Sequence, residues 1–98
     1  MRVDLIAKLK FNEAEYLQLL QIYFVDFKKL NDDIEMNQYS MFLVHKLKAN
    51  GSLLGFPELF NLLNDIQKFG SVNESQKNEL LSYERKIEAI LSGKVKIV

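Results

Sequence analysis

Residues 41–55 read MFLVHKLKANGSLLG and have the hydrophobic spacing of an amphipathic helix. Leu43, Leu47 and Leu54 fall on one side of a helix that turns by about 100° per residue. On this pattern His45, the only histidine in the chain, lies almost opposite the leucine stripe and faces solvent. A solitary imidazole on the wet face of a helix suits a chemical role.

The limits of this helix are predicted from its flanking residues. We expect it to run from about Gln38 to Leu53, with Gly55 closing it in a left-handed conformation and Pro57 in the first turn of the next helix. Gly51 lies near the buried stripe, where a residue without a side chain permits close helix packing.

The preceding helix has a marked start. Asn12 is a suitable N-cap with Glu15 as the third helical residue, and Phe11 and Tyr16 occupy the two positions of a hydrophobic staple. The apolar spacing that follows predicts a helix that ends near Asn31.

The acidic stretch 31–37 is then expected to be a loop. Further on, Gly70 ends the helix that begins near Pro57, and Asn73 with Gln76 forms a capping-box pattern for a last helix that ends near Ser92.

Taken together, these patterns predict an all-α protein, an antiparallel four-helix bundle formed by a single domain over residues 1–98. A short N-terminal helix around residues 3–9 is expected to cover one end of the bundle, and residues 94–98 to fray. The expected core combines the apolar stripes of all four helices: Leu17, Leu20, Phe24, Phe27, Leu30, Leu43, Leu47, Leu54, Leu59, Leu62, Leu63, Ile66, Phe69, Leu80, Tyr83, Ile87 and Ile90.

Composition narrows the classes of function. The 13 basic and 13 acidic side chains balance, so there is no overall positive field to attract nucleic acid or a membrane surface. Cysteine is absent, which removes disulfides and thiolate chemistry and fits a reducing compartment. Charged and amide residues interrupt every apolar run, and Asp4 interrupts what would be a signal sequence. We expect a cytoplasmic, free-standing protein.

The pattern His-x-Leu-Lys at residues 45–48, followed by Leu54-Gly55 and preceded by a helix with Phe24 and Asp26, resembles the histidine phosphotransfer (HPt) domain of phosphorelays. The resemblance covers roughly residues 17–69, and Leu59, Leu63 and Ile66 occupy the apolar positions that follow in the family. Two positions depart from the family pattern: Ala49 replaces a usual glycine, and Gln67 replaces an acid.

The resemblance implies a monomeric HPt-like phosphocarrier that acts between receiver-domain aspartates of response regulators and hybrid sensor histidine kinases. It implies neither an enzyme nor a kinase, because catalysis and Mg²⁺ would come from the partner receiver domain, and this chain would bind no cofactor or metal of its own.

His45 is then the expected phosphoacceptor, and Lys48, one turn further on, the residue that stabilises phosphoryl charge. Lys46 lies off that face. The expected partner-binding residues around the imidazole are Met41, Phe42, Ala49 and Ser52.

Two alternative functions, a binding module and an enzyme, remain open. A noncatalytic HPt-like adaptor would bind a receiver or kinase through the same face without transfer. An acid–base enzyme would need a carboxylate to orient His45, which its own helix lacks, although the preceding helix can supply one. The acidic stretch beginning at Asn31 does not match a calcium loop, because the sixth-position glycine and the twelfth-position glutamate are missing.

Overall fold

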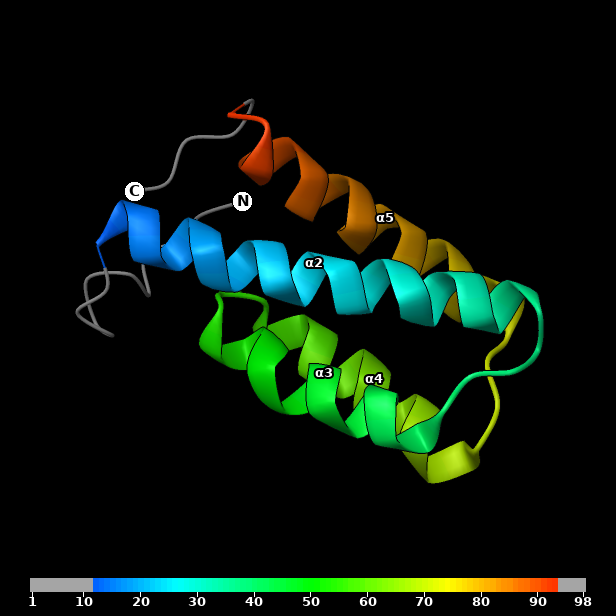
Figure 1. Cartoon of the computed structure of the whole chain (residues 1–98). Coiled ribbons are helices and arrows are strands. Elements are labelled where there is room, and N and C mark those ends of the chain that lie inside the picture. Colours follow the sequence, from blue (N-terminus) through cyan, green and yellow to red (C-terminus); the bar gives the residue numbers. More distant parts are fainter. Residues whose placement is uncertain (1–11, 94–98) are drawn as a thin grey trace.

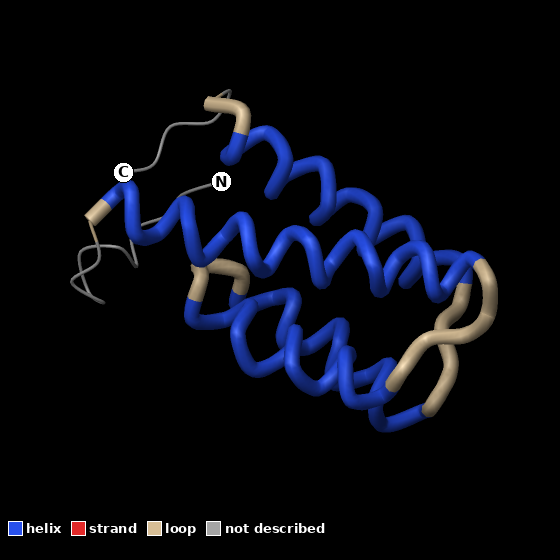
Figure 2. The backbone as a smooth tube through the Cα atoms, viewed as in Figure 1, coloured by secondary structure: helices blue, strands red, loops and turns tan. Residues whose placement is uncertain are grey.

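A computed structural model describes residues 12–93 and contains four helices in that range, with no strand among those residues (Figures 1 and 2). They are α2 (Glu13–Glu35), α3 (Met41–Leu53), α4 (Pro57–Phe69) and α5 (Glu74–Leu91). Successive helices run in opposite directions, and α2 packs against both α5 and α3 while α3 packs against α4 (Figure 1). The prediction of an all-helical bundle is confirmed. The expected N-terminal helix, the staple residue Phe11 and the C-terminal tail lie outside the described residues.

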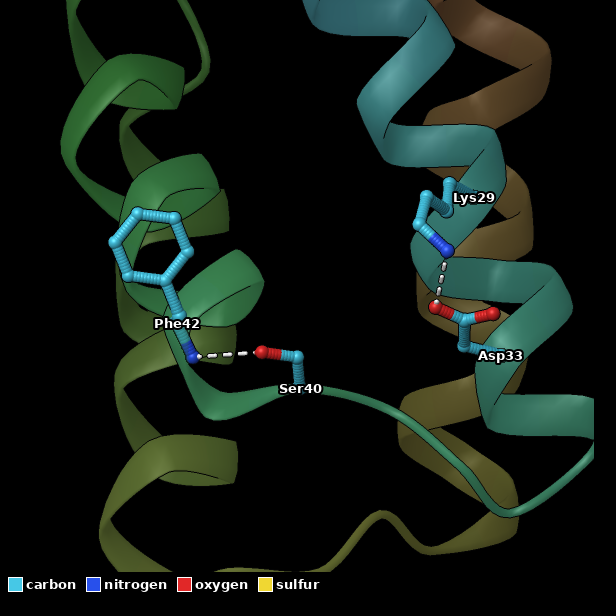
Figure 3. A network of polar contacts seen from close by, with 4 residues as sticks. All are labelled: Lys29, Asp33, Ser40 and Phe42. Carbon is cyan, nitrogen blue, oxygen red and sulfur yellow. Dashed lines mark hydrogen bonds and ion pairs between the residues drawn. The ribbon is translucent and has the colours of Figure 1, made fainter.

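Helix α2 starts as expected and ends later than expected. The Asn12 side chain accepts a hydrogen bond of 2.8 Å from the backbone nitrogen of Glu15. The helix continues to Glu35, so the prediction of a loop from Asn31 was wrong. The reason is tertiary, because Asn31 is buried and donates a 2.9 Å hydrogen bond to Glu84 of α5, and Ile34 is also buried. Lys29 and Asp33 add an ion pair of 3.2 Å along the same turns (Figure 3).

Helix α3 begins at Met41, three residues later than the expected Gln38. Ser40 is the N-cap, and its hydroxyl accepts a hydrogen bond of 3.2 Å from the backbone nitrogen of Phe42 (Figure 3). Asn37 has a positive φ of 55°, which breaks the helical path before Ser40. The cap therefore sets the true start of the histidine helix.

The turn from α3 to α4 forms as predicted. Gly55 has a φ of 101°, a region that favours glycine. The backbone nitrogens of Phe56 and Gly55 donate to the carbonyls of Gly51 and Ser52, at 2.9 and 3.2 Å, which is the double hydrogen bond of a Schellman motif. Pro57 follows as the first residue of α4.

The other predicted helix boundaries are also confirmed. Gly70 ends α4 in the left-handed conformation, with a φ of 71°. Asn73 and Gln76 form the full reciprocal capping box at the start of α5.

The core contains most of the predicted stripe residues. Leu43, Leu47, Leu54 and the inward residues of α4 and α5 are buried, while Leu17, Phe24 and Tyr83 are partly buried at its margin. Phe69 is the clear exception: its side chain is 70% exposed, because it lies at the last residue of α4, beyond the packed part of the helix. Val44 and Phe56 are buried and were not predicted to be.

Two buried tyrosines of α2 hold the segment that carries His45. Tyr16 donates a hydrogen bond to the carbonyl of Leu54, and Tyr23 donates one of 2.8 Å to the carbonyl of Leu47. A β-carbon added to Gly51 would lie 2.7 Å from the Tyr23 hydroxyl oxygen. The expectation that Gly51 permits close packing is confirmed, and Tyr23 is the residue that approaches it.

Candidate functional site

His45 lies in the second turn of α3 with its side chain exposed, whereas Leu43 and Leu47 are buried in the bundle. The expected orientation of the helix is therefore confirmed. The ring is not isolated from other helices: its Nδ1 atom lies 3.4 Å from Nε2 of Gln67 on α4. With Nδ1 facing α4, Nε2 is the ring nitrogen left for a reaction partner.

Lys48 lies one turn beyond His45 and is held by the same part of α4. Its ammonium nitrogen donates hydrogen bonds to Oε1 of Gln67, at 2.6 Å, and to Oδ1 of Asn64, at 3.3 Å. The same nitrogen lies 5.5 Å from the centre of the Phe60 ring, within the range of a cation–π contact. The charge of Lys48 is thus fixed beside the imidazole by neutral groups.

The residues of α4 that complete this cluster were missed by sequence reasoning. Phe60, Asn64 and Gln67 are spaced by four and three residues, so they share the outward face of α4. In the sequence, Gln67 stands out only as a departure from the acid of the HPt pattern. The spacing of the three residues predicts that they share one face of α4. That this face lies beside His45 follows only from the packing of α4 on α3.

Lys46 points to the other side of α3, as expected. It forms an ion pair of 2.9 Å with Asp26 of α2. Asp26 is the kind of carboxylate from the preceding helix that an acid–base enzyme would need, yet it pairs with Lys46. Among residues 12–93, no carboxylate lies within ion-pair distance of His45.

A shallow groove between α2 and α3 lies on this Lys46 side. Leu19, Ile22 and Leu53 line it together with Asp26 and Lys46, and His45 is not part of its lining. The imidazole is therefore accessible from open surface, where a large partner can reach it.

The four residues predicted to contact a partner lie near His45 on the surface of α3. Met41, Phe42 and Ala49 are exposed, and Ser52 is half-buried. Phe42 has an exposed fraction of 77%, the largest among the large hydrophobic residues described. Phe60, 40% exposed, extends the apolar surface onto α4. Whether a partner uses this surface stays a prediction.

Within the described residues, no group of three or more histidine or acidic side chains is placed to hold a metal ion. No helix among residues 12–93 has both the length and the apolar character needed to cross a membrane. Burial raises the pKa of the Tyr16 hydroxyl to about 12 and also raises that of the Tyr23 hydroxyl. Neither hydroxyl is available as an acid or base near neutral pH.

Comparison with known proteins identifies no relative of this chain. No protein-family model, curated protein or solved structure matches the chain.

Proposed function

We propose that this chain is an HPt-like phosphocarrier, which accepts a phosphoryl group on His45 from the aspartate of one receiver domain and passes it to another. The observation that carries the proposal is the exposed imidazole of α3 with the ammonium of Lys48 held beside it on the same face. The sequence pattern around His45 and the helical bundle are in keeping with the same function.

The chemistry needs little from this chain. A lone pair on Nε2 of His45 attacks the phosphorus of the aspartyl phosphate, an N–P bond forms, and the O–P bond breaks to release the aspartate carboxylate. Phosphoryl transfer of this kind depends mainly on positioning and charge neutralisation. The receiver domain would contribute Mg²⁺ and its acidic pocket, and Lys48 would contribute a positive charge near the transferred oxygens.

The surface around His45 favours a protein partner over a small substrate. Phe42 is exposed one turn before the imidazole, and Ala49 is exposed one turn after it. An apolar side chain on one side and a small one on the other allow a bulky domain to approach the ring while burying apolar area. The partner would complete a reaction site that α3 supplies only in part.

The test is ³¹P NMR of the chain after incubation with a phosphorylated receiver domain, with His45→Gln as the matched control. The expected result is a phosphohistidine signal that is present only in the native sequence and decays when unphosphorylated receiver is added. Because His45 is exposed, the variant should keep the circular dichroism spectrum and unfolding midpoint of the native chain.

One result would contradict the phosphocarrier function. If the native chain binds the receiver, and His45→Gln binds it equally well, but no phosphohistidine forms with any phosphorylated receiver, the carrier function is wrong. The noncatalytic adaptor then takes its place.

A further inference from the structure

Gln67 links the two residues of the proposed site through the two ends of one amide. Lys48 Nζ lies 2.6 Å from Oε1 of Gln67, and Nε2 of the same amide lies 3.4 Å from Nδ1 of His45. An ammonium group has donors only, so the amide atom that Lys48 approaches has to be the acceptor oxygen. The orientation of the amide is therefore set by the chemistry of Lys48.

This orientation restricts the protonation of the imidazole. The amide end that faces His45 is an NH₂ group, which only donates, so Nδ1 has to accept. A neutral imidazole whose Nδ1 accepts carries its proton on Nε2. In that tautomer the electron pair of Nε2 belongs to the aromatic ring, so the nitrogen that faces a reaction partner cannot attack phosphorus.

We propose that Gln67 is a positioning residue that holds His45 in the unreactive tautomer until an anion engages Lys48. When phosphoryl oxygens or receiver carboxylates draw the ammonium away from Oε1, the amide is free to turn over. The ring proton then moves from Nε2 to Nδ1 through solvent, the amide oxygen accepts a hydrogen bond from Nδ1–H, and Nε2 is left with an in-plane lone pair that can attack phosphorus. The proposal rests on the phosphocarrier function, and it makes the arrival of the partner's negative charge the trigger for nucleophilicity.

The turned amide also suits the product. Formation of the N–P bond leaves a positive charge on the ring, which is shared with Nδ1–H. An amide oxygen that accepts this proton stabilises the phosphorylated ring, while Lys48 is free to face the phosphoryl oxygens. One reorientation thus serves both the nucleophile and the phosphoryl group.

The first test reads the tautomer directly and needs no phosphotransfer. Because the chain has a single histidine, two-bond ¹H–¹⁵N spectra of the ¹⁵N-labelled protein report His45 without ambiguity. Under alkaline conditions that keep the ring neutral, the native chain should carry the proton on Nε2. Gln67→Glu presents acceptors only, so the proton should move to Nδ1, with a change of about tenfold in the tautomer ratio, the net worth of one hydrogen bond.

Two lysine variants distinguish the effect of Lys48 on the Gln67 amide from a general effect of positive charge. Lys48→Met removes the donor that orients the amide and should move the ratio toward Nδ1–H. Lys46→Met removes the same charge from the same helix, but Lys46 pairs with Asp26, so the ratio should stay at the native value. A native ring already protonated on Nδ1, or the same ratio in the native chain and Gln67→Glu, would overturn the proposal.

A second test measures phosphorylation by phosphoramidate, a small donor that does not require a receiver. Gln67→Glu should be labelled on His45 about tenfold faster than the native chain, in line with its tautomer ratio. Equal labelling rates despite different tautomers would overturn the link between tautomer and reactivity. If neither protein is labelled while the tautomers differ as expected, the positioning role of Gln67 stands and the phosphocarrier function fails.

Discussion

Replacing Gly51 by alanine should destabilise the bundle through one atom, the hydroxyl oxygen of Tyr23. The added β-carbon would lie 2.7 Å from that oxygen, and Tyr23 is buried and held in place by its hydrogen bond to the carbonyl of Leu47. Overpacking of this kind costs about 1–3 kcal/mol, and a weakened Tyr23 hydrogen bond costs about 1 kcal/mol. Alanine in place of glycine inside a helix contributes about 1 kcal/mol in the other direction. The net expectation is a loss of about 2 kcal/mol.

The matched background is Tyr23→Phe, which removes the clashing oxygen. Alone it should cost about 1 kcal/mol, for the hydrogen bond to the carbonyl of Leu47. With phenylalanine in place, the nearest side-chain atom to the new methyl group is Cδ2 of Leu59, at 3.4 Å, which is ordinary contact. Gly51→Ala should then stabilise the chain by about 1 kcal/mol, so the double variant returns close to native stability.

Urea unfolding of the four proteins measures this cycle. The expected coupling between the two substitutions is about 3 kcal/mol, far above the few tenths expected for independent sites. The sign of the alanine substitution should reverse between the two backgrounds. If Gly51→Ala costs the same in both, within about 0.5 kcal/mol, the close approach of Tyr23 is not what requires glycine at this position.

Three further predictions concern the surface, a helix cap and alkaline pH. Phe42→Asp should weaken receiver binding, measured by titration calorimetry, while Val25→Asp should not, because Val25 lies on the surface of α2 among Lys28, Lys29 and Asp32 and not on the face of α3 that carries His45. The two side chains are 77% and 59% exposed, so neither change should move the unfolding midpoint appreciably. Ser40→Ala removes the N-cap of α3 and should lower the free energy of unfolding by about 1 kcal/mol in urea, and a loss below about 0.3 kcal/mol would contradict its capping role. Burial raises the pKa of Tyr16 from 10.0 to about 12 and raises that of Tyr23 as well, so the unfolded chain releases these protons first. The contribution of the two protonated hydroxyls to the free energy of unfolding should be fully present below pH 10.0 and should decrease as the pH rises toward 12. Tyr23→Phe should make this decrease shallower when urea unfolding is measured across the same pH range.

The helix boundaries that depend on local chemistry could be predicted from the sequence. Asn12, Gly55, Gly70 and Asn73 act through hydrogen bonds or dihedral angles within a few residues of themselves, so the sequence around each is sufficient. The end of α2 could not be predicted in this way. Asn31 is typical of a helix end in its local sequence. The helix continues because Asn31 donates a hydrogen bond to Glu84, which is 53 residues away, and because Ile34 is buried against the rest of the bundle.

The candidate site could likewise be predicted only where it depends on the local sequence. The position of His45 on α3 follows from helical periodicity, because the leucines of the same helix define its buried side. The contact with Gln67 joins residues 22 positions apart and depends on how α4 packs on α3. Phe69 shows the converse error, since its spacing fits the apolar stripe, but at the last residue of α4 its side chain is 70% exposed.

The opposite placement of the two lysines beside His45 also bears on how a partner finds this surface. Because Asp26 neutralises Lys46, Lys48 is the one of the pair whose charge an approaching acidic domain meets. A single charge is screened within about 8–10 Å at physiological salt and does little to steer a partner from a distance. For the proposed receiver partner, the association rate should therefore change little with ionic strength, and discrimination between receivers would take place after contact, at the imidazole itself.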